Sequence, residues 1–164
     1  MALQHLKFLG GKDPEELWWL TNTTVPGLIL LMVLPRWKHT KTISLLGPLI
    51  MALVYSLGFF SLVLYPEHEP DPNASFTSLE GVVALFKDEA GVFIGWVHFI
   101  VFDGLVARWM VLDSVEKGTS TMLHILIVIP CLIIGILAGP LGFLLYMILK
   151  NFIPDSTVKK NKNE

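Results

Sequence analysis

Four long apolar stretches constrain what this 164-residue chain can fold into. They lie at 17–35, 42–66, 91–112 and 118–149. Three of them carry no acidic residue, lysine or arginine, and the remaining one carries only Asp103 and Arg108. A helix that crosses the hydrocarbon core of a bilayer needs ~20 mostly apolar residues, and it satisfies its own backbone hydrogen bonds there. The stretches therefore predict helices that cross a membrane.

The composition agrees with a membrane protein rather than with a soluble domain. Hydrophobic residues make up 53% of the chain and charged residues 16%, and the mean hydropathy is +0.62. A soluble domain carries about 25% charged residues. We expect an all-α fold, a four-transmembrane-helix bundle with helices at 17–34, 43–65, 91–112 and 123–149. This domain would occupy residues 17–150, between a polar N-terminal segment at 1–16 and a polar C-terminal tail at 151–164.

The segment between the second and third helices divides into two parts. Residues 66–75 are acidic and rich in proline, which predicts a loop in water. Residues 78–86 form an apolar run too short to cross, and we expect them to be a short amphipathic segment at the membrane interface. Four crossings would place Lys117 and Lys150 on opposite sides of the membrane. The cations of the loop at 36–41 favour the cytoplasmic, stromal or matrix side for that loop.

The third helix concentrates polar side chains at membrane depth. They are Trp96, His98, Asp103, Arg108 and Asp113. Each ionisable group there costs roughly 2.5–3.5 kcal/mol on insertion scales, so it needs a partner or a function. Because five residues turn a helix by about 140°, the ionisable groups from His98 to Asp113 cannot share one face. Asp103 falls near mid-helix, and we expect it to point into the bundle.

The other three helices offer partners for Asp103. Their candidate side chains are Asn22, Tyr55 and His124, and their prolines, which free backbone carbonyls, are Pro26, Pro48, Pro130 and Pro140. For Asp103 we favour a functional role, and for His98 a functional and a structural role stay open. For Asn22, Tyr55 and His124, hydrogen bonding between helices is favoured. For Arg108 and Asp113, near the helix end, we favour a structural role at the interface.

Several kinds of site find no support in the sequence. The net charge of −2 argues against a nucleic-acid partner. A single cysteine, Cys131, rules out an internal disulfide framework. The histidines lack the paired spacing of a metal site, so we expect no metal. Neither a phosphate-binding glycine loop nor a GxSxG nucleophile motif occurs.

One combination of motifs resembles a known family. The stretch at 95–118 reads GWVHFIVFDGLVARWMVLDSVEKG and contains the pattern W-x-H-x4-D-x4-R-x4-D. Further matches are LTN at 20–22, LPRW at 34–37, FTSLEGVVALF at 76–86 and GPLGFLLYMILK at 139–150. Together these blocks resemble the abscisic-acid-deficient-four-like membrane proteins of plants, algae and bacteria, over most of the chain. The loop at 66–75 is longer and more acidic than in the compact bacterial forms.

The resemblance implies a small four-helix protein of a plastid membrane or a bacterial plasma membrane. In plants the family is tied to the formation of neoxanthin from violaxanthin. That reaction is an isomerisation that needs an acid and a base but no cofactor. As catalytic candidates we take Asp103 for the acid and His98, or less favourably His124, for the base. The other candidates, for a binding or structural polar cluster, are Asn22, Arg36, Tyr55, Trp96, Arg108 and Asp113.

A non-catalytic alternative stays open. A chain this small could be a structural subunit, or a pigment- or lipid-binding subunit, of a larger membrane complex, because one deep acidic residue is little equipment for an isomerase. In either case the expected partners are the lipid bilayer and a carotenoid ligand. Further copies of the chain, or other membrane subunits, are expected partners as well.

Overall fold

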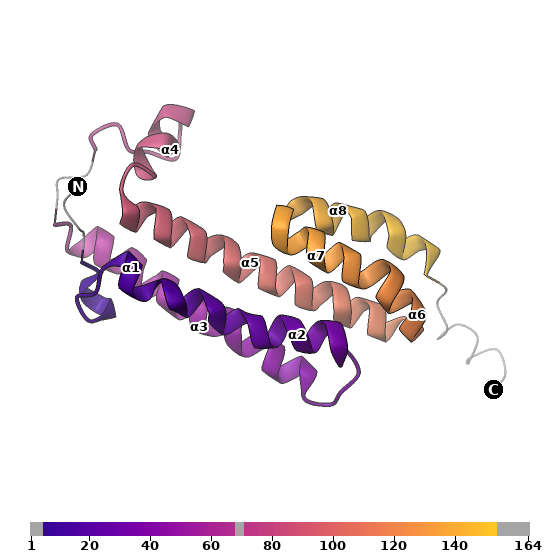
Figure 1. Cartoon of the computed structure of the whole chain (residues 1–164). Helices are drawn as coiled ribbons and strands as arrows, with labels where there is room; N and C mark the ends of the chain where they lie inside the picture. The colour runs from indigo at the N-terminus through magenta and orange to yellow at the C-terminus, as the bar shows by residue number, and fades with distance from the viewer. Residues whose placement is uncertain (1–4, 68–70, 154–164) are drawn as a thin grey trace. The chain divides into compact units, whose positions relative to one another are not determined.

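A computed structural model describes residues 5–67 and 71–153, and Figure 1 shows its helices. Residues 1–4 of the expected N-terminal segment, 68–70 of the acidic loop and 154–164 of the tail lie outside the described residues. In the described ranges all regular elements are helical, apart from one isolated bridge between Leu6 and Lys12. The expected all-α class is therefore confirmed.

Three helices in the described ranges are long and apolar enough to cross a membrane. They are α3 (Thr40–Leu64), α5 (Glu89–Glu116) and a helical run over Thr121–Ala138. That run consists of α6 (Thr121–Leu123), a π-helical turn η3 (His124–Val128) and α7 (Ile129–Ala138). Large apolar side chains such as Leu53, Phe102 and Leu137 lie exposed on these helices. The second and third expected helices correspond to α3 and α5.

The first expected helix, at 17–34, is helical but not uniform. It begins in α1 (Pro14–Leu17), continues as the 3-10 helix η2 (Trp18–Thr24) and becomes α-helical again in α2 (Val25–Val33). Pro26 explains the change, because it lacks an N–H and cannot bond to the carbonyl of Asn22, four residues earlier. This segment is therefore not one of the three long helices.

The expected single helix at 123–149 is wrong. The chain breaks at Gly139, which has φ +41°, and continues as α8 (Pro140–Leu149) and the 3-10 turn η4 (Lys150–Phe152). Pro140 has no N–H, and a proline disfavours the helical conformation of the residue before it. The two helices lie side by side in Figure 1, and a methyl group on Gly142 would overlap the backbone of Gly135. Helices α7 and α8 therefore form a closely packed hairpin.

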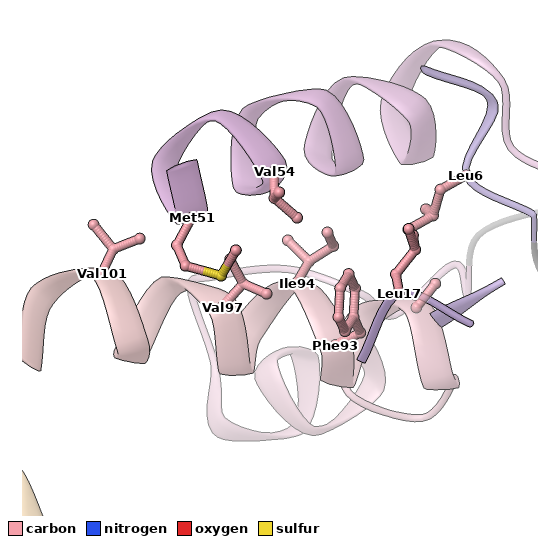
Figure 2. Close-up of a cluster of buried hydrophobic side chains, with 9 residues drawn as sticks. Leu6, Leu17, Met51, Val54, Phe93, Ile94, Val97 and Val101 are labelled. Carbon is pink, nitrogen blue, oxygen red and sulfur yellow. The ribbon is translucent and has the colours of Figure 1, made fainter. Parts of the chain in front are cut away.

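The chain divides into two compact units, which we describe separately. Unit 1 holds residues 1–23 and 49–101, and unit 2 holds 24–48 and 102–164. Figure 2 shows the core of unit 1, where Met51 and Val54 of α3 face Ile94 and Val97 of α5. The core of unit 2 gathers buried side chains of α2, α5, α7 and α8, among them Leu31, Met110, Val111, Leu132 and Tyr146.

The expected amphipathic segment at 78–86 forms the short helix α4 (Leu79–Leu85) of unit 1. The Ser78 hydroxyl oxygen caps it by accepting a hydrogen bond from the Gly81 N–H at 3.0 Å. Seven residues rise only about 10 Å, so α4 is too short to cross a bilayer. A further 3-10 turn, η1 (Lys7–Leu9), lies near the N-terminus.

Candidate functional site

An aromatic groove of about 340 Å³ lies in unit 1 and is lined by two of the candidate residues, Tyr55 and His98. Its walls include Tyr55 and Phe59 from α3, Leu85 and Phe86 from the end of α4, and His98 and Phe99 from α5. Residues three and four apart lie on one face of a helix, which explains why positions 55, 59 and 62 line the groove together. The same spacing brings positions 91, 95 and 98 of α5 to it.

Gly95 allows the Phe86 ring to pack closely against α5 at the wall of this groove. A methyl group on Gly95 would overlap the Phe86 ring, so the missing side chain makes the close approach of ring and helix possible. The segment that follows α4 is thereby held against α5. The identity of residue 95 thus sets the width of the groove at this point.

Two of the lining side chains, His98 and Tyr55, carry polar groups. The His98 ring lies 5.5 Å from the Tyr55 ring and 5.9 Å from the Phe99 ring, measured between centroids. Tyr55 also stacks on Phe59 at 6.0 Å. Tyr55 is half-buried and His98 exposed. The structure therefore brings together His98 and Tyr55, two of the candidates, in an otherwise apolar setting.

Asp103 belongs to unit 2 and lies near the middle of α5. The turn between α7 and α8 packs against it, because a methyl carbon on Gly139 would lie 3.3 Å from Asp103 Oδ1. One residue further, a methyl carbon on Gly104 would lie 3.0 Å from Pro48 Cγ, so α3 approaches closely here. Within the described part of the chain the Asp103 side chain has no hydrogen bond or ion pair.

His124 and Arg36 each contact a backbone carbonyl oxygen within unit 2. His124 is 3% exposed, and its Nε2 lies 3.1 Å from the carbonyl oxygen of Met32 at the end of α2. Its own carbonyl accepts from the Ile129 N–H, which makes the turn π-helical, and Pro130 follows. The Arg36 guanidinium donates to the Thr119 carbonyl. Both side chains tie α2 to the segment after α5, and His124 contacts Met32 rather than Asp103.

Asp113 is the centre of a polar cluster. The sequence analysis named Asp113 as a candidate residue but did not name its neighbours Tyr146 and Lys150 as candidates. The Tyr146 hydroxyl donates to Asp113 Oδ2 at 2.7 Å, and the Nζ atoms of Lys117 and Lys150 each lie 3.8 Å from that oxygen. Lys150 Nζ also lies 5.0 Å from the Trp109 ring centroid. Tyr146 and Lys150 were missed because a single helix at 123–149 would carry Lys150 away from Asp113. Lys117 and Lys150 lie at the same end of unit 2, which corrects their expected placement on opposite sides.

The remaining candidates lie apart from these groups. Arg108 donates through Nε and Nη2 to the Lys41 carbonyl oxygen, at 3.2 and 3.0 Å, and so joins α5 to the start of α3. Trp96 is half exposed and stacks on Trp18 at 6.2 Å between ring centroids. Asn22 is exposed on η2. In the part of the chain that the structure describes, no group of three or more histidine, cysteine or acidic side chains gathers as metal ligands.

Comparison with known proteins adds one finding. The model of the ABA DEFICIENT 4-like family matches residues 16–146. No curated protein and no solved structure matches the chain. The matched range contains the groove residues, Asp103, His124 and the cluster around Asp113 as far as Tyr146.

Proposed function

The chain belongs to the ABA DEFICIENT 4-like family, and from this premise we propose that it is an integral membrane protein that binds and isomerises an epoxycarotenoid. The reaction would be of the type that converts violaxanthin into neoxanthin. The membrane would be a plastid membrane or a bacterial plasma membrane. The three long apolar helices support the membrane location, because their exposed leucine and phenylalanine side chains suit lipid rather than water.

The aromatic groove of unit 1 is the observation that carries the proposal. Carotenoids are rigid apolar molecules that dissolve in the bilayer, and their oxygenated ends need only a few polar contacts. Ligand sites are typically apolar, with a small number of polar groups that fix the orientation of the ligand. Tyr55, Phe59 and Phe99 supply flat apolar walls, and His98 with the Tyr55 hydroxyl supplies the polar groups.

The proposed chemistry is a redox-neutral isomerisation. An acid protonates the oxygen of the 5,6-epoxide while the bond between that oxygen and C6 breaks, which leaves a hydroxyl group on C5. A base removes the proton on C7, and the C7–H electron pair forms the C6–C7 double bond of the allene. One proton enters and one leaves, so the product has the composition of the substrate and no cofactor is consumed.

Each catalytic assignment has its own support. His98 is the proposed base because it lines the groove, whereas the ring of His124 is buried against the Met32 carbonyl. Asp103 is the proposed acid because an acidic side chain at the middle of a membrane-crossing helix is costly and needs a function. The assignment of Asp103 depends only on its place on α5, so it is tested separately from His98.

Expression together with the enzymes that make violaxanthin tests the proposal. Chromatography of extracted pigments should show neoxanthin with the original chain, and none with Asp103→Asn or His98→Ala. His39→Ala, in the loop before α3, is the matched histidine control and should keep full conversion. Unchanged conversion in one of the first two variants removes that residue from the mechanism. If the original chain is present in the membrane at normal amounts and still forms no neoxanthin, the proposed isomerase activity is overturned.

A specific observation favours binding without conversion as the second candidate. Among the residues that the structure describes, none that lines the groove is acidic, so these lining residues offer no carboxylic acid for epoxide opening. A pigment-binding subunit would need only the apolar walls. Purification in mild detergent followed by solvent extraction separates the two candidates. Unmodified epoxycarotenoid at one molecule per chain favours binding alone, and a converted pigment favours the isomerase.

A further inference from the structure

We propose that the aromatic groove holds one end ring of the carotenoid, and that the Tyr55 hydroxyl selects pigments with a hydroxyl group on that ring. Tyr55 is then a specificity-determining residue that also positions the ring. The inference rests on the proposed function, because it concerns the carotenoid bound in the same groove. It adds which part of the pigment enters the groove and which chemical group is recognised there.

The size of the groove fits one end ring rather than a whole carotenoid. One water molecule takes up roughly 30 Å³ of liquid, so a groove of about 340 Å³ holds on the order of ten non-hydrogen atoms. The substituted end ring of a xanthophyll has about that many, and the whole pigment has several times more. The polyene chain and the second ring therefore stay outside the groove, where the acyl chains of the lipid suit them.

The Tyr55 hydroxyl has no partner within the protein that would compete with a ligand. The Tyr55 ring packs against the rings of Phe59 and His98, but in the part of the chain that the structure describes its hydroxyl makes no hydrogen bond. The buried side-chain oxygens that lack a partner in these residues belong to Thr23 and Ser44, so the Tyr55 hydroxyl is not enclosed by the protein. A ligand group in the groove can therefore reach it.

The chemistry of the lining favours a hydroxyl group as the recognised feature. Among the described residues that line the groove, Tyr55 and His98 have polar side chains and the others are apolar. His98 is the proposed base, which leaves Tyr55 for binding. A tyrosine hydroxyl both donates and accepts, and so does a hydroxyl group on the end ring, whereas an epoxide oxygen only accepts. The ring hydroxyl is thus the group that uses both capacities of Tyr55.

A hydroxyl held at Tyr55 also fixes the reacting carbon. On the end ring, the carbon that carries the hydroxyl lies opposite the carbon to which C7 is attached. The Tyr55 and His98 rings are neighbours, 5.5 Å apart between centroids. Holding the hydroxyl at Tyr55 therefore sets where C7 lies relative to His98, and such positioning of reacting groups speeds a reaction.

A series of three pigments tests the proposal on the purified full chain in detergent. The diepoxides of zeaxanthin (which is violaxanthin), β-cryptoxanthin and β-carotene carry a hydroxyl on both rings, on one ring and on neither. Pigment bound to the captured chain is measured by chromatography, with converted and unconverted pigment counted together. The first two should bind within about twofold of each other, because one ring enters the groove, and the third roughly 3- to 10-fold more weakly, because it lacks the hydrogen bond.

Tyr55→Phe removes the hydroxyl and keeps the ring that packs on Phe59 and His98. It should bind all three pigments with similar affinity, at the level of the β-carotene diepoxide. Tyr65→Phe is the matched control, because Tyr65 is a tyrosine of the same unit that packs on Phe8 outside the groove. It should keep the selectivity of the original chain. A merely structural role of Tyr55 would weaken binding of all three pigments equally and leave their ratios unchanged.

The outcomes separate this proposal from the proposed function. Equal binding of all three pigments to the original chain would overturn selection by the ring hydroxyl, while carotenoid binding would stand. A loss of affinity with each hydroxyl removed would contradict recognition of a single ring. Selectivity that persists in Tyr55→Phe would remove Tyr55 from recognition. No binding of any pigment would overturn this proposal and the proposed function together. If Tyr55→Phe fails to fold, the series on the original chain decides.

Discussion

Replacing Gly142 with alanine tests the α7–α8 hairpin, because the structure leaves no room for a methyl group there. The added carbon would overlap the backbone N and Cα of Gly135 and approach the carbonyl oxygen of Cys131. Backbone atoms cannot rotate away as the end of a side chain can, so the helices must separate. Overpacking of this kind costs ~1–3 kcal/mol, and alanine recovers at most ~1 kcal/mol of it through its higher helix propensity.

A single straight helix at 123–149 would predict the opposite effect of Gly142→Ala on stability, because Gly142 would then have no helix α7 folded back against it. Alanine would stabilise that helix by up to ~1 kcal/mol. Gly135→Ala is the matched control, since its added carbon meets Met110 Cε at 3.8 Å, an ordinary contact. Thermal unfolding in detergent should show a melting temperature several degrees lower for Gly142→Ala than for Gly135→Ala. A melting temperature of Gly142→Ala at or above that of the original chain would refute the hairpin.

Two further predictions concern single contacts, and a third concerns the orientation of the chain in the membrane. Lys87 donates to Asp71 at 2.6 Å, which lowers the pKa of Asp71 from its usual 3.8 and raises the pKa of Lys87. The contact therefore stabilises the folded chain at neutral pH, and this contribution is lost as the pH falls through the lowered pKa of Asp71. The substitution Lys87→Gln should raise the pKa of Asp71 back toward its usual value, as measured by NMR titration. An unchanged pKa would contradict the contact. Tyr146→Phe removes the donor to Asp113 and should lower the free energy of unfolding by ~1–3 kcal/mol, whereas an unchanged melting temperature would contradict this part-buried hydrogen bond. Lys38→Cys, in a chain whose native cysteine is replaced by alanine, should react with an impermeant maleimide only from the cytoplasmic, stromal or matrix side, and labelling from the opposite side would reverse the orientation.

Helices α3 and α5 could be predicted from the sequence because their length and apolar composition leave few alternatives in lipid. The hairpin could not. Gly139–Pro140 inside an apolar run indicates a break, but a break permits either a kink or a reversal of the chain. The contact between Gly135 and Gly142 favours the reversal, and such a contact between helices leaves no periodic pattern in the sequence.

The candidate sites, too, could be predicted from the sequence only in part. The polar residues of α5 stand out in an apolar run, so His98, Asp103 and Asp113 could be found from the sequence. Their neighbours depend on which helix faces them. Tyr146 reaches Asp113 only through the hairpin, and the groove beside His98 depends on the short segment that ends at Phe86.

The pigment bound to the purified chain tests most directly whether the aromatic groove holds a carotenoid. The original chain, isolated from membranes that contain epoxycarotenoids, should retain xanthophyll in solvent extracts. Gly95→Leu should retain none at equal protein yield, because the larger side chain would displace the Phe86 ring and fill the groove. Pigment at equal amounts in both proteins, or in neither, would contradict a carotenoid in this groove.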